Sequence, residues 1–175
     1  MSADETSERI KRAALARFVE VGYGSTTVDE IAAGAGVGVA SLYRRWPDKA
    51  ALANELVVDY LEAVDAILAP IGGGTRRSRF LTLWDRMWQQ AQADPDLLLF
   101  VEAQASAGFL TDDVAVRKAD MGDRWMDAMG DFGIRADPVA AASMLVGTVT
   151  AVWRGGLQVD PDDLGERLWA ALRTE

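Results

Sequence analysis

Residues 26–52, TTVDEIAAGAGVGVASLYRRWPDKAAL, contain the pattern that decides the fold of the amino-terminal region. The pattern predicts two short helices joined by a tight turn, followed by the start of a third. Thr27 and Glu30 have the spacing of a capping box, in which each side chain bonds the other residue's backbone N–H. Gly36 follows four residues after the small Ala32, which predicts a close helix approach and a left-handed residue that ends the first helix.

The second helix of this pair has two chemically different faces. Leu42 and Trp46 are one turn apart and form an apolar face that we expect to point inward. The opposite face carries Ala40, Tyr43 and Arg44. Small side chains near a helix start admit base edges in a DNA major groove, while Tyr and Arg reach phosphates or guanine. The residues alone leave two interpretations open, a DNA-binding face and an ordinary solvated surface.

Together with the helix predicted before it, this stretch resembles the amino-terminal domain of the tetracycline-repressor (TetR) family. The matching residues are Ala13, Ala14, Phe18, Gly22, Tyr23, Thr26, Thr27, Val28, Ile31, Ala32, Ala35, Gly36, Val37, Ser41, Leu42, Tyr43, Pro47 and Lys49. The family usually has leucine, serine, glycine and phenylalanine where this chain has Arg17, Gly38, Ala40 and Trp46. None of these departures removes a DNA-facing group.

The resemblance implies how the motif would contact double-stranded DNA. Phosphates would be held by Thr27, Tyr43, Arg44 and Lys49, and base edges would be met by Val39, Ala40, Ser41 and Arg45. The methyl groups of Val39 and Ala40 suit thymine, so direct hydrogen-bond readout is expected to be sparse. Two such helices in a homodimer are expected to read a palindromic operator.

The composition limits the chemistry that this chain can perform. Half of its 175 residues are hydrophobic, and it has no cysteine and no histidine. Disulfides, thiolate or imidazole metal sites and catalysis by His or Cys are excluded, which leaves carboxylate, Lys, Tyr or Ser chemistry. The composition does not exclude an enzyme, but its commonest catalytic groups are missing, and we expect no cofactor and no enzymatic activity. No apolar run approaches the ~20 residues that span a bilayer, and the polar start MSADETSERI lacks a signal sequence. We therefore expect a cytoplasmic protein without a membrane partner.

The negative charge of the chain is unevenly distributed. The formal net charge is −9, yet residues 1–49 hold seven basic and seven acidic residues, against eleven and twenty in residues 50–175. The acidic bulk is expected to keep nonspecific DNA affinity low, because nonspecific binding is largely electrostatic. A helical carboxylate enzyme is a rival interpretation that rests only on this acid excess, and the acids fall mainly at helix starts.

The sequence predicts an all-α protein, and the resemblance implies nine helices. Besides the two helices of the motif, we expect helices at about 8–21, 49–69, 78–92, 95–107, 112–131, 138–154 and 161–173, with residues 1–7 disordered. Asp48 and three Asp-Pro pairs, beginning at Asp94, Asp137 and Asp160, mark helix starts. The expected domains are a DNA-binding domain at 1–49 and an effector-binding and dimerisation domain at 50–175.

The helix at 138–154, PVAAASMLVGTVTAVWR, is apolar nearly all round and therefore needs two packing partners. It is either the central core helix of a monomer or a self-complementary interface between two copies. The family builds its dimer from its last two helices, so the resemblance favours the interface. The expected interface residues are Val139, Ser143, Val146, Thr150, Leu164, Leu168 and Leu172.

Large apolar side chains also line the helices expected at 78–92, 95–107 and 112–131. Such spacing is ordinarily core, but a few polar groups among apolar ones are typical of a small-molecule cavity. The resemblance places an inducer pocket here, with an expected lining of Trp84, Trp88, Phe100, Gln104, Lys118, Met121 and Trp125. The arginines at 76, 77 and 79 are interpreted as a solvated helix start and not as a second nucleic-acid contact.

The function predicted from the sequence is a homodimeric transcriptional regulator, a repressor that a small, largely apolar effector releases from a palindromic operator. The alternative is a helix-turn-helix regulator whose carboxy-terminal domain binds a protein partner. A fully packed region between the fourth and seventh helices would favour that alternative.

Overall fold

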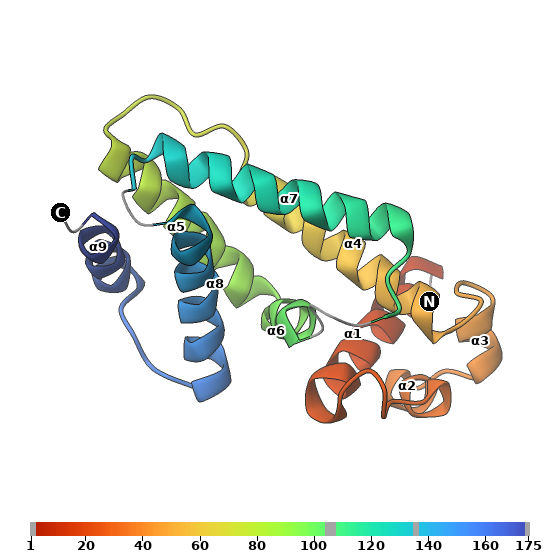
Figure 1. Ribbon diagram of the computed structural model, residues 1–175. Helices are drawn as coiled ribbons and strands as arrows, with labels where there is room; N and C mark the ends of the chain where they lie inside the picture. The colour runs from red at the N-terminus through yellow and green to blue at the C-terminus, as the bar shows by residue number, and fades with distance from the viewer. Residues whose placement is uncertain (1–2, 104–107, 135–136, 174–175) are drawn as a thin grey trace. The chain divides into compact units, whose positions relative to one another are not determined.

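The computed structural model describes residues 3–103, 108–134 and 137–173, and within these ranges it contains helices and no strand. The helices are α1 (Ala3–Val21), α2 (Val28–Ala35), α3 (Val39–Tyr43), α4 (Lys49–Ile67), α5 (Arg76–Ala93), α6 (Pro95–Ala103), α7 (Asp112–Asp131), α8 (Pro138–Gly155) and α9 (Pro161–Leu172) (Figure 1). The all-α prediction is confirmed. Among the described helices, none combines the length and apolar character that a membrane span requires.

Local capping residues explain where several helices begin. The Asp48 carboxylate accepts a hydrogen bond of 2.7 Å from a backbone N–H in the first turn of α4. Asp137 and Asp160 do the same for α8 and α9, at 3.0 and 2.9 Å. Because each cap satisfies an N–H that the helix itself leaves unpaired, these starts were predictable from the sequence.

The expectation of a disordered amino terminus is wrong for the residues that the structure describes. Residues 1–7 were expected to be disordered, but α1 begins at Ala3, and Ser7 is buried. The acidic Asp4 and Glu5 lie in the first turn, where the helix dipole favours negative charge. At the other end, Val21 is 40% exposed and does not continue the buried stripe of α1.

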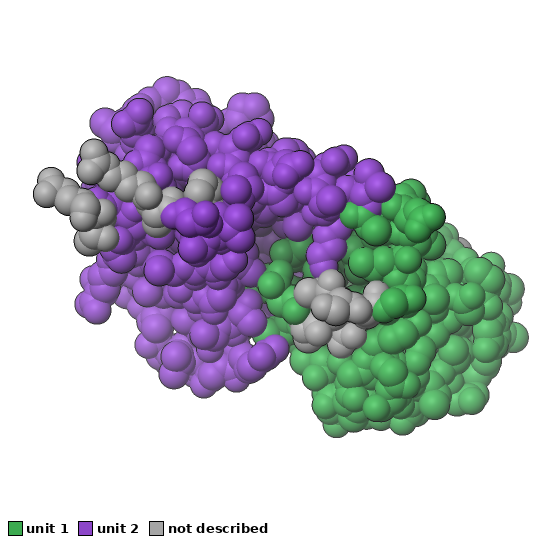
Figure 2. Space-filling model, in the orientation of Figure 1, with its two compact units in different colours: residues 1–60, 96–115 green, residues 61–95, 116–175 purple. Residues whose placement is uncertain are grey.

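The chain forms two compact units (Figure 2). Unit 1 comprises residues 1–60 and 96–115, and unit 2 comprises residues 61–95 and 116–175. The predicted boundary after residue 49 is a functional one and stays a prediction. α6 and the start of α7 nevertheless group with the helix-turn-helix region in unit 1, which the sequence did not suggest. Of the helix predicted at 95–107, residues 104–107 lie outside the described part.

The core of unit 1 is built around α1. Ile10, Ala14 and Phe18 form its buried stripe, and Leu15 is buried beside them. α2 approaches α1 closely, since a Cβ added at Gly34 would lie 3.4 Å from the Cβ of Ala13. Buried side chains of α2, α3 and α4 complete this core: Ile31, Ala32, Ala35, Leu42, Leu52, Ala53 and Leu56.

Unit 2 is built around α5. The buried face of α5 consists of Phe80, Leu83, Trp84, Met87, Trp88 and Ala91. α9 packs on it so tightly that a Cβ at Gly165 would lie 2.5 Å from Trp84 Cδ1. The Trp84 indole N–H donates a 2.7 Å hydrogen bond to the Pro161 carbonyl. Glycine at position 165 therefore sets the distance between these two helices.

Candidate nucleic-acid interface

The start of α2 is fixed by a complete capping box. The Glu30 N–H donates to Thr27 Oγ1 at 3.3 Å, and the Thr27 N–H donates to Glu30 Oε2 at 2.8 Å. The hydrogen bond from the Thr27 backbone is the main cause that lowers the pKa of the Glu30 carboxyl, and the Thr27 hydroxyl adds to it. This confirms the predicted capping box and leaves the Thr27 side chain exposed at the surface.

Gly36 ends α2 as predicted, with a left-handed φ of 62°. A Cβ at this position would lie 2.8 Å from a guanidinium nitrogen of Arg9. That guanidinium donates to the Ala35 carbonyl, and so joins α1 to the end of α2. The left-handed backbone therefore favours glycine at this position.

α3 presents the two faces that the sequence predicted. Leu42 and Trp46 are buried, whereas Ala40, Tyr43, Arg44 and Arg45 are exposed, and Val39 and Ser41 are half-buried. The outer face therefore offers small groups at the start of the helix and an aromatic ring with two cations at its end. One guanidinium nitrogen of Arg44 donates to Ser41 Oγ at 3.0 Å, which orders its side chain along the helix.

Lys49 is engaged within the protein. Its ammonium donates to the carbonyls of Tyr23 and Thr26, at 2.6 and 2.7 Å, and lies 4.3 Å from the centre of the Tyr23 ring. These bonds tie the α1–α2 loop to the start of α4. A lysine ammonium has three N–H donors, so one remains for a phosphate. The phosphate contact implied for Lys49 stays a prediction.

Arg17, the unusual residue of α1, forms ion pairs with two carboxylates. Its guanidinium lies 2.7 Å from Glu20 on the same helix and 2.7 Å from Glu30 on α2. It therefore bridges α1 to the capping box. A leucine at this position would leave Glu30 without its cationic partner.

Charged residues also join α1 to α4. Lys11 lies 2.9 Å from Glu55 and 2.8 Å from Asp59. The Trp46 indole N–H donates to the other oxygen of Glu55 at 2.6 Å. Burial alone would raise the pKa of Glu55, but the hydrogen bonds from Lys11 and Trp46 outweigh it and lower the pKa. This network fixes Trp46, and with it the end of α3, against α4.

An aromatic row and one amide hold α6 and the segment after it to the rest of unit 1. Phe100 stacks on Phe18 with ring centres 5.0 Å apart, and the ring centre of Phe109 lies 4.4 Å from that of Tyr23. The buried Asn54 amide donates to the carbonyl of Phe109 at 2.8 Å and accepts from the N–H of Thr111 at 3.0 Å. Neither Asn54 nor Phe109 was predicted to have a role. A polar residue among the apolar positions of α4 was the available signal.

Comparison with known proteins agrees with this geometry. Residues 10–56 match the sequence profile of bacterial regulatory proteins of the tetR family. The match covers the helix-turn-helix segment, about a quarter of the chain. An uncharacterised HTH-type transcriptional regulator of Mycobacterium bovis is 38% identical over 60 residues, covering 34% of this chain and 32% of that protein. The chain spans less than half the length of the curated relatives that it matches.

Solved structures share the fold across the whole chain. The ketosteroid transcriptional regulator KstR2 of Mycobacterium tuberculosis is 20% identical with a TM-score of 0.74, covering 97% of this chain and 95% of that one. AibR in complex with isovaleryl coenzyme A and operator DNA is 15% identical with a TM-score of 0.72, covering 96% and 98%. At these identities the likeness concerns the fold, namely a TetR-type helix-turn-helix followed by a helical domain.

The residues predicted to line an effector pocket are divided between the two units. Trp84, Trp88 and Trp125 are buried in unit 2, and Phe100 belongs to unit 1. Lys118 and Met121 are half-buried on α7, and Gln104 lies outside the described residues. The six described residues of this set do not line the groove that Leu68, Leu83, Ala128 and Phe132 form in unit 2. The predicted pocket stays a prediction.

The residues predicted for dimerisation divide by exposure. Val139 and Ser143 are exposed on α8, while Val146, Thr150 and Leu164 are half-buried. Leu168 and Leu172 are buried within the protomer, on the helix that packs against α5, and their predicted role in a dimer stays a prediction. They have almost no surface left to offer to a second copy. The outer surface of α8 instead consists of Val139, Ala140, Ser143, Met144, Gly147 and Ala151.

The arginines at the start of α5 have structural partners. Arg77 forms a two-pronged ion pair with Glu166 of α9, and Arg79 donates to the Asp131 carbonyl at the end of α7 at 3.0 Å. These two arginines therefore join α5 to α9 and to the end of α7, and the interpretation of the cluster as a solvated helix start stays a prediction.

Proposed function

We propose that this protein is a DNA-binding transcriptional regulator that acts as a homodimer on a palindromic operator. The observation that carries this proposal is the outer face of α3, where Ala40 and Tyr43 are exposed opposite the buried Leu42. Arg44 and Arg45, directly after the helix, are exposed beside them. The match of residues 10–56 to the tetR family profile supports the same function.

The proposed DNA contacts follow the chemistry of this face. Thr27, Tyr43, Arg44 and Lys49 hold phosphates, and Val39, Ala40, Ser41 and Arg45 meet base edges. Tyr43, with 51% of its surface exposed, has no role in the core. The Ser41–Arg44 hydrogen bond holds the guanidinium in place before binding, which reduces the side-chain entropy lost on contact.

The homodimer is proposed to form through α8. Its outer surface carries small side chains at one-turn spacing around Gly147, which allows two helices to approach closely. In the protomer, a Cβ added at Gly147 would have no neighbour within 4 Å. In such a dimer the two α3 helices read half-sites about one helical turn apart, roughly 10 bp.

The regulator is proposed to be a repressor that a small molecule releases from DNA. AibR, which shares the fold, has been solved with both isovaleryl coenzyme A and operator DNA. The groove in unit 2 supports a small effector over a protein partner, because a region without space for a ligand was the expected sign of the alternative.

Selection of bound duplexes from a random-sequence library with the purified full-length chain tests this function. We expect enrichment of an inverted repeat with half-sites about one turn apart. Recovery of unrelated duplexes, with binding that vanishes at moderate salt, would indicate nonspecific electrostatic attraction and contradict the proposal.

A further inference from the structure

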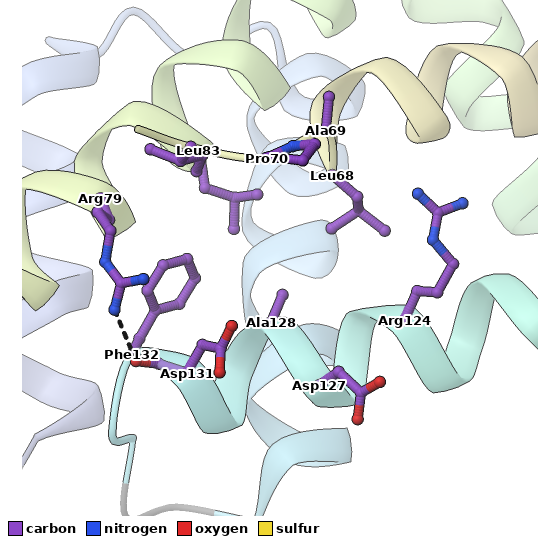
Figure 3. Close-up of a pocket in the computed structure, with 11 residues that line it drawn as sticks. Leu68, Ala69, Pro70, Arg79, Leu83, Arg124, Asp127, Ala128, Asp131 and Phe132 are labelled. Atoms are coloured by element: carbon purple, nitrogen blue, oxygen red, sulfur yellow. Dashed lines mark hydrogen bonds between the residues drawn. The ribbon is translucent and has the colours of Figure 1, made fainter. Parts of the chain in front are cut away.

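A groove in unit 2 lies between the end of α4, α5 and α7 (Figure 3). Its volume is about 390 Å³, within the range of small-molecule sites. The apolar side chains Leu68, Leu83, Ala128 and Phe132 line it. An apolar molecule of about the size of a substituted benzene can therefore bury much of its surface here.

Hydrogen bonds from two arginines of α5 fix the walls of the groove. Arg86 donates to the carbonyls of Ile67 and Ala69, at 3.1 and 2.7 Å, and so holds the end of α4 to α5. Arg79 donates to the Asp131 carbonyl at 3.0 Å and holds the end of α7. The groove is therefore formed before any ligand arrives.

The charged side chains around the groove differ in whether they are already engaged. Arg124 is paired with Asp65, which lies outside the groove. Arg79 donates to a neutral backbone carbonyl and lies 5.9 Å from the centre of the Phe132 ring. Its guanidinium forms no ion pair with a described carboxylate, and its buried Nε has no hydrogen-bond partner. The carboxylates of Asp127 and Asp131 have no hydrogen bond or ion pair with any described residue. Figure 3 shows Arg79, Asp131 and Phe132 at one end of the groove, and Arg124 and Asp127 at the other.

The net charge of the surrounding chain favours a positively charged ligand. Residues 50–175 hold twenty acidic and eleven basic residues. Such an excess attracts cations and repels anions from the surface. A polyanion such as the coenzyme A thioester bound by AibR is therefore poorly matched to this groove.

We propose that this groove binds an organic cation, a protonated amine attached to an apolar body. The ammonium group pairs with the Asp131 carboxylate, with Asp127 one helical turn away. The apolar body packs on Leu83, Ala128 and Phe132. The proposal that the groove binds such a cation depends only on the groove itself. The proposal that the groove is the effector site rests on the proposed regulatory function.

Three probes with the same apolar body test the sign of the charge. The probes are 4-phenylbutylamine, 4-phenylbutanol and 4-phenylbutyrate, each titrated calorimetrically into the full-length protein near pH 7 without DNA. We expect the amine to bind roughly fivefold more tightly than the alcohol at low salt, as a partly exposed ion pair allows. The butyrate should bind most weakly, and added salt should shrink the differences.

Two variants locate the site. Asp131→Asn should remove most of the preference for the amine and leave the affinity of the alcohol unchanged. Asp123→Asn, which removes an exposed carboxylate of α7 outside the groove, is the matched control and should change nothing. Ala128→Leu should fill the groove and weaken all three probes, while circular dichroism checks that the helices remain.

Equal affinities for the three probes, tighter binding of the butyrate, or no binding of any probe would overturn the proposal. So would an Ala128→Leu variant that binds all three unchanged. Because no DNA is present, failure here differs from failure of the regulatory function, which the selection of duplexes tests separately.

Discussion

At the scale of single residues, Gly36 shows how one backbone conformation shapes the DNA-binding motif. Its φ of 62° opposes a side chain, and the Arg9 guanidinium, 2.8 Å from where a Cβ would lie, would have to shift. We expect Gly36→Ala to lower the free energy of unfolding by about 1–2 kcal/mol, the usual cost of a left-handed alanine. Urea titration measures this. Gly24→Ala, whose Cβ would meet nothing within 4 Å, is the control, and an equal loss in both variants would rule out this explanation.

Glu55 gives the stability of the protein a pH dependence. Its pKa is lowered in the folded state because the hydrogen bonds from Lys11 and Trp46 outweigh burial. A carboxyl with a lowered folded-state pKa stabilises the fold above its unfolded pKa of about 4.3, and this contribution disappears as the pH falls through the folded-state value. Glu55→Gln should therefore lose less stability than the wild type between about pH 6 and pH 3, measured by urea unfolding. Glu62→Gln, an exposed change on the same helix, should behave like the wild type.

At the scale of helices and segments, Asn54 couples α4 to the segment that follows α6. We expect Asn54→Ala to cost about 1–3 kcal/mol, because it leaves partly buried backbone groups of Phe109 and Thr111 unpaired. Amide hydrogen exchange should accelerate at residues 108–115 more than in α5. Uniform acceleration across both units would show a general loss of stability and contradict the specific coupling.

The sequence predicted helix boundaries well where the signal is local. Asp48, Asp137 and Asp160 cap the next turn of the chain, so neighbouring residues contain all the information. The contacts of Phe109 join positions far apart in the sequence, and spacing patterns do not reveal them. The extension of α1 to Ala3 was missed because a polar segment without apolar spacing was interpreted as disordered.

At the scale of the whole molecule, the proposed dimer makes Gly147 a sensitive position. Its Cβ would project into open space in the protomer, so Gly147→Leu should leave the protomer folded while separating two α8 helices. We expect at least a tenfold weaker dimer by sedimentation across a dilution series. Gly130→Leu, on α7 and equally free of neighbours, is the matched control. A wild-type chain that sediments as a monomer at micromolar concentration would remove the dimer altogether.

The two proposed sites could not be predicted equally well from the sequence. The residues of α3 that are proposed to face DNA follow from one short pattern, and the structure leaves Tyr43 and the adjacent Arg44 exposed. The groove in unit 2 depends on which charges are already paired. Only the structure shows that Arg124 forms an ion pair with Asp65, whereas the Asp131 carboxylate forms no ion pair with a described residue.

The central claim is that the outer face of α3 binds DNA, and the affinity of Arg44→Ala for a selected duplex tests it most directly. Fluorescence anisotropy over a salt series gives both the dissociation constant and its salt slope. We expect roughly tenfold weaker binding and a slope reduced by about one, the signature of one lost phosphate contact. Arg167→Ala, an exposed arginine of α9, removes the same charge elsewhere and should bind like the wild type. Equal affinities and slopes for the two variants would contradict the assignment of α3 as the DNA-binding helix.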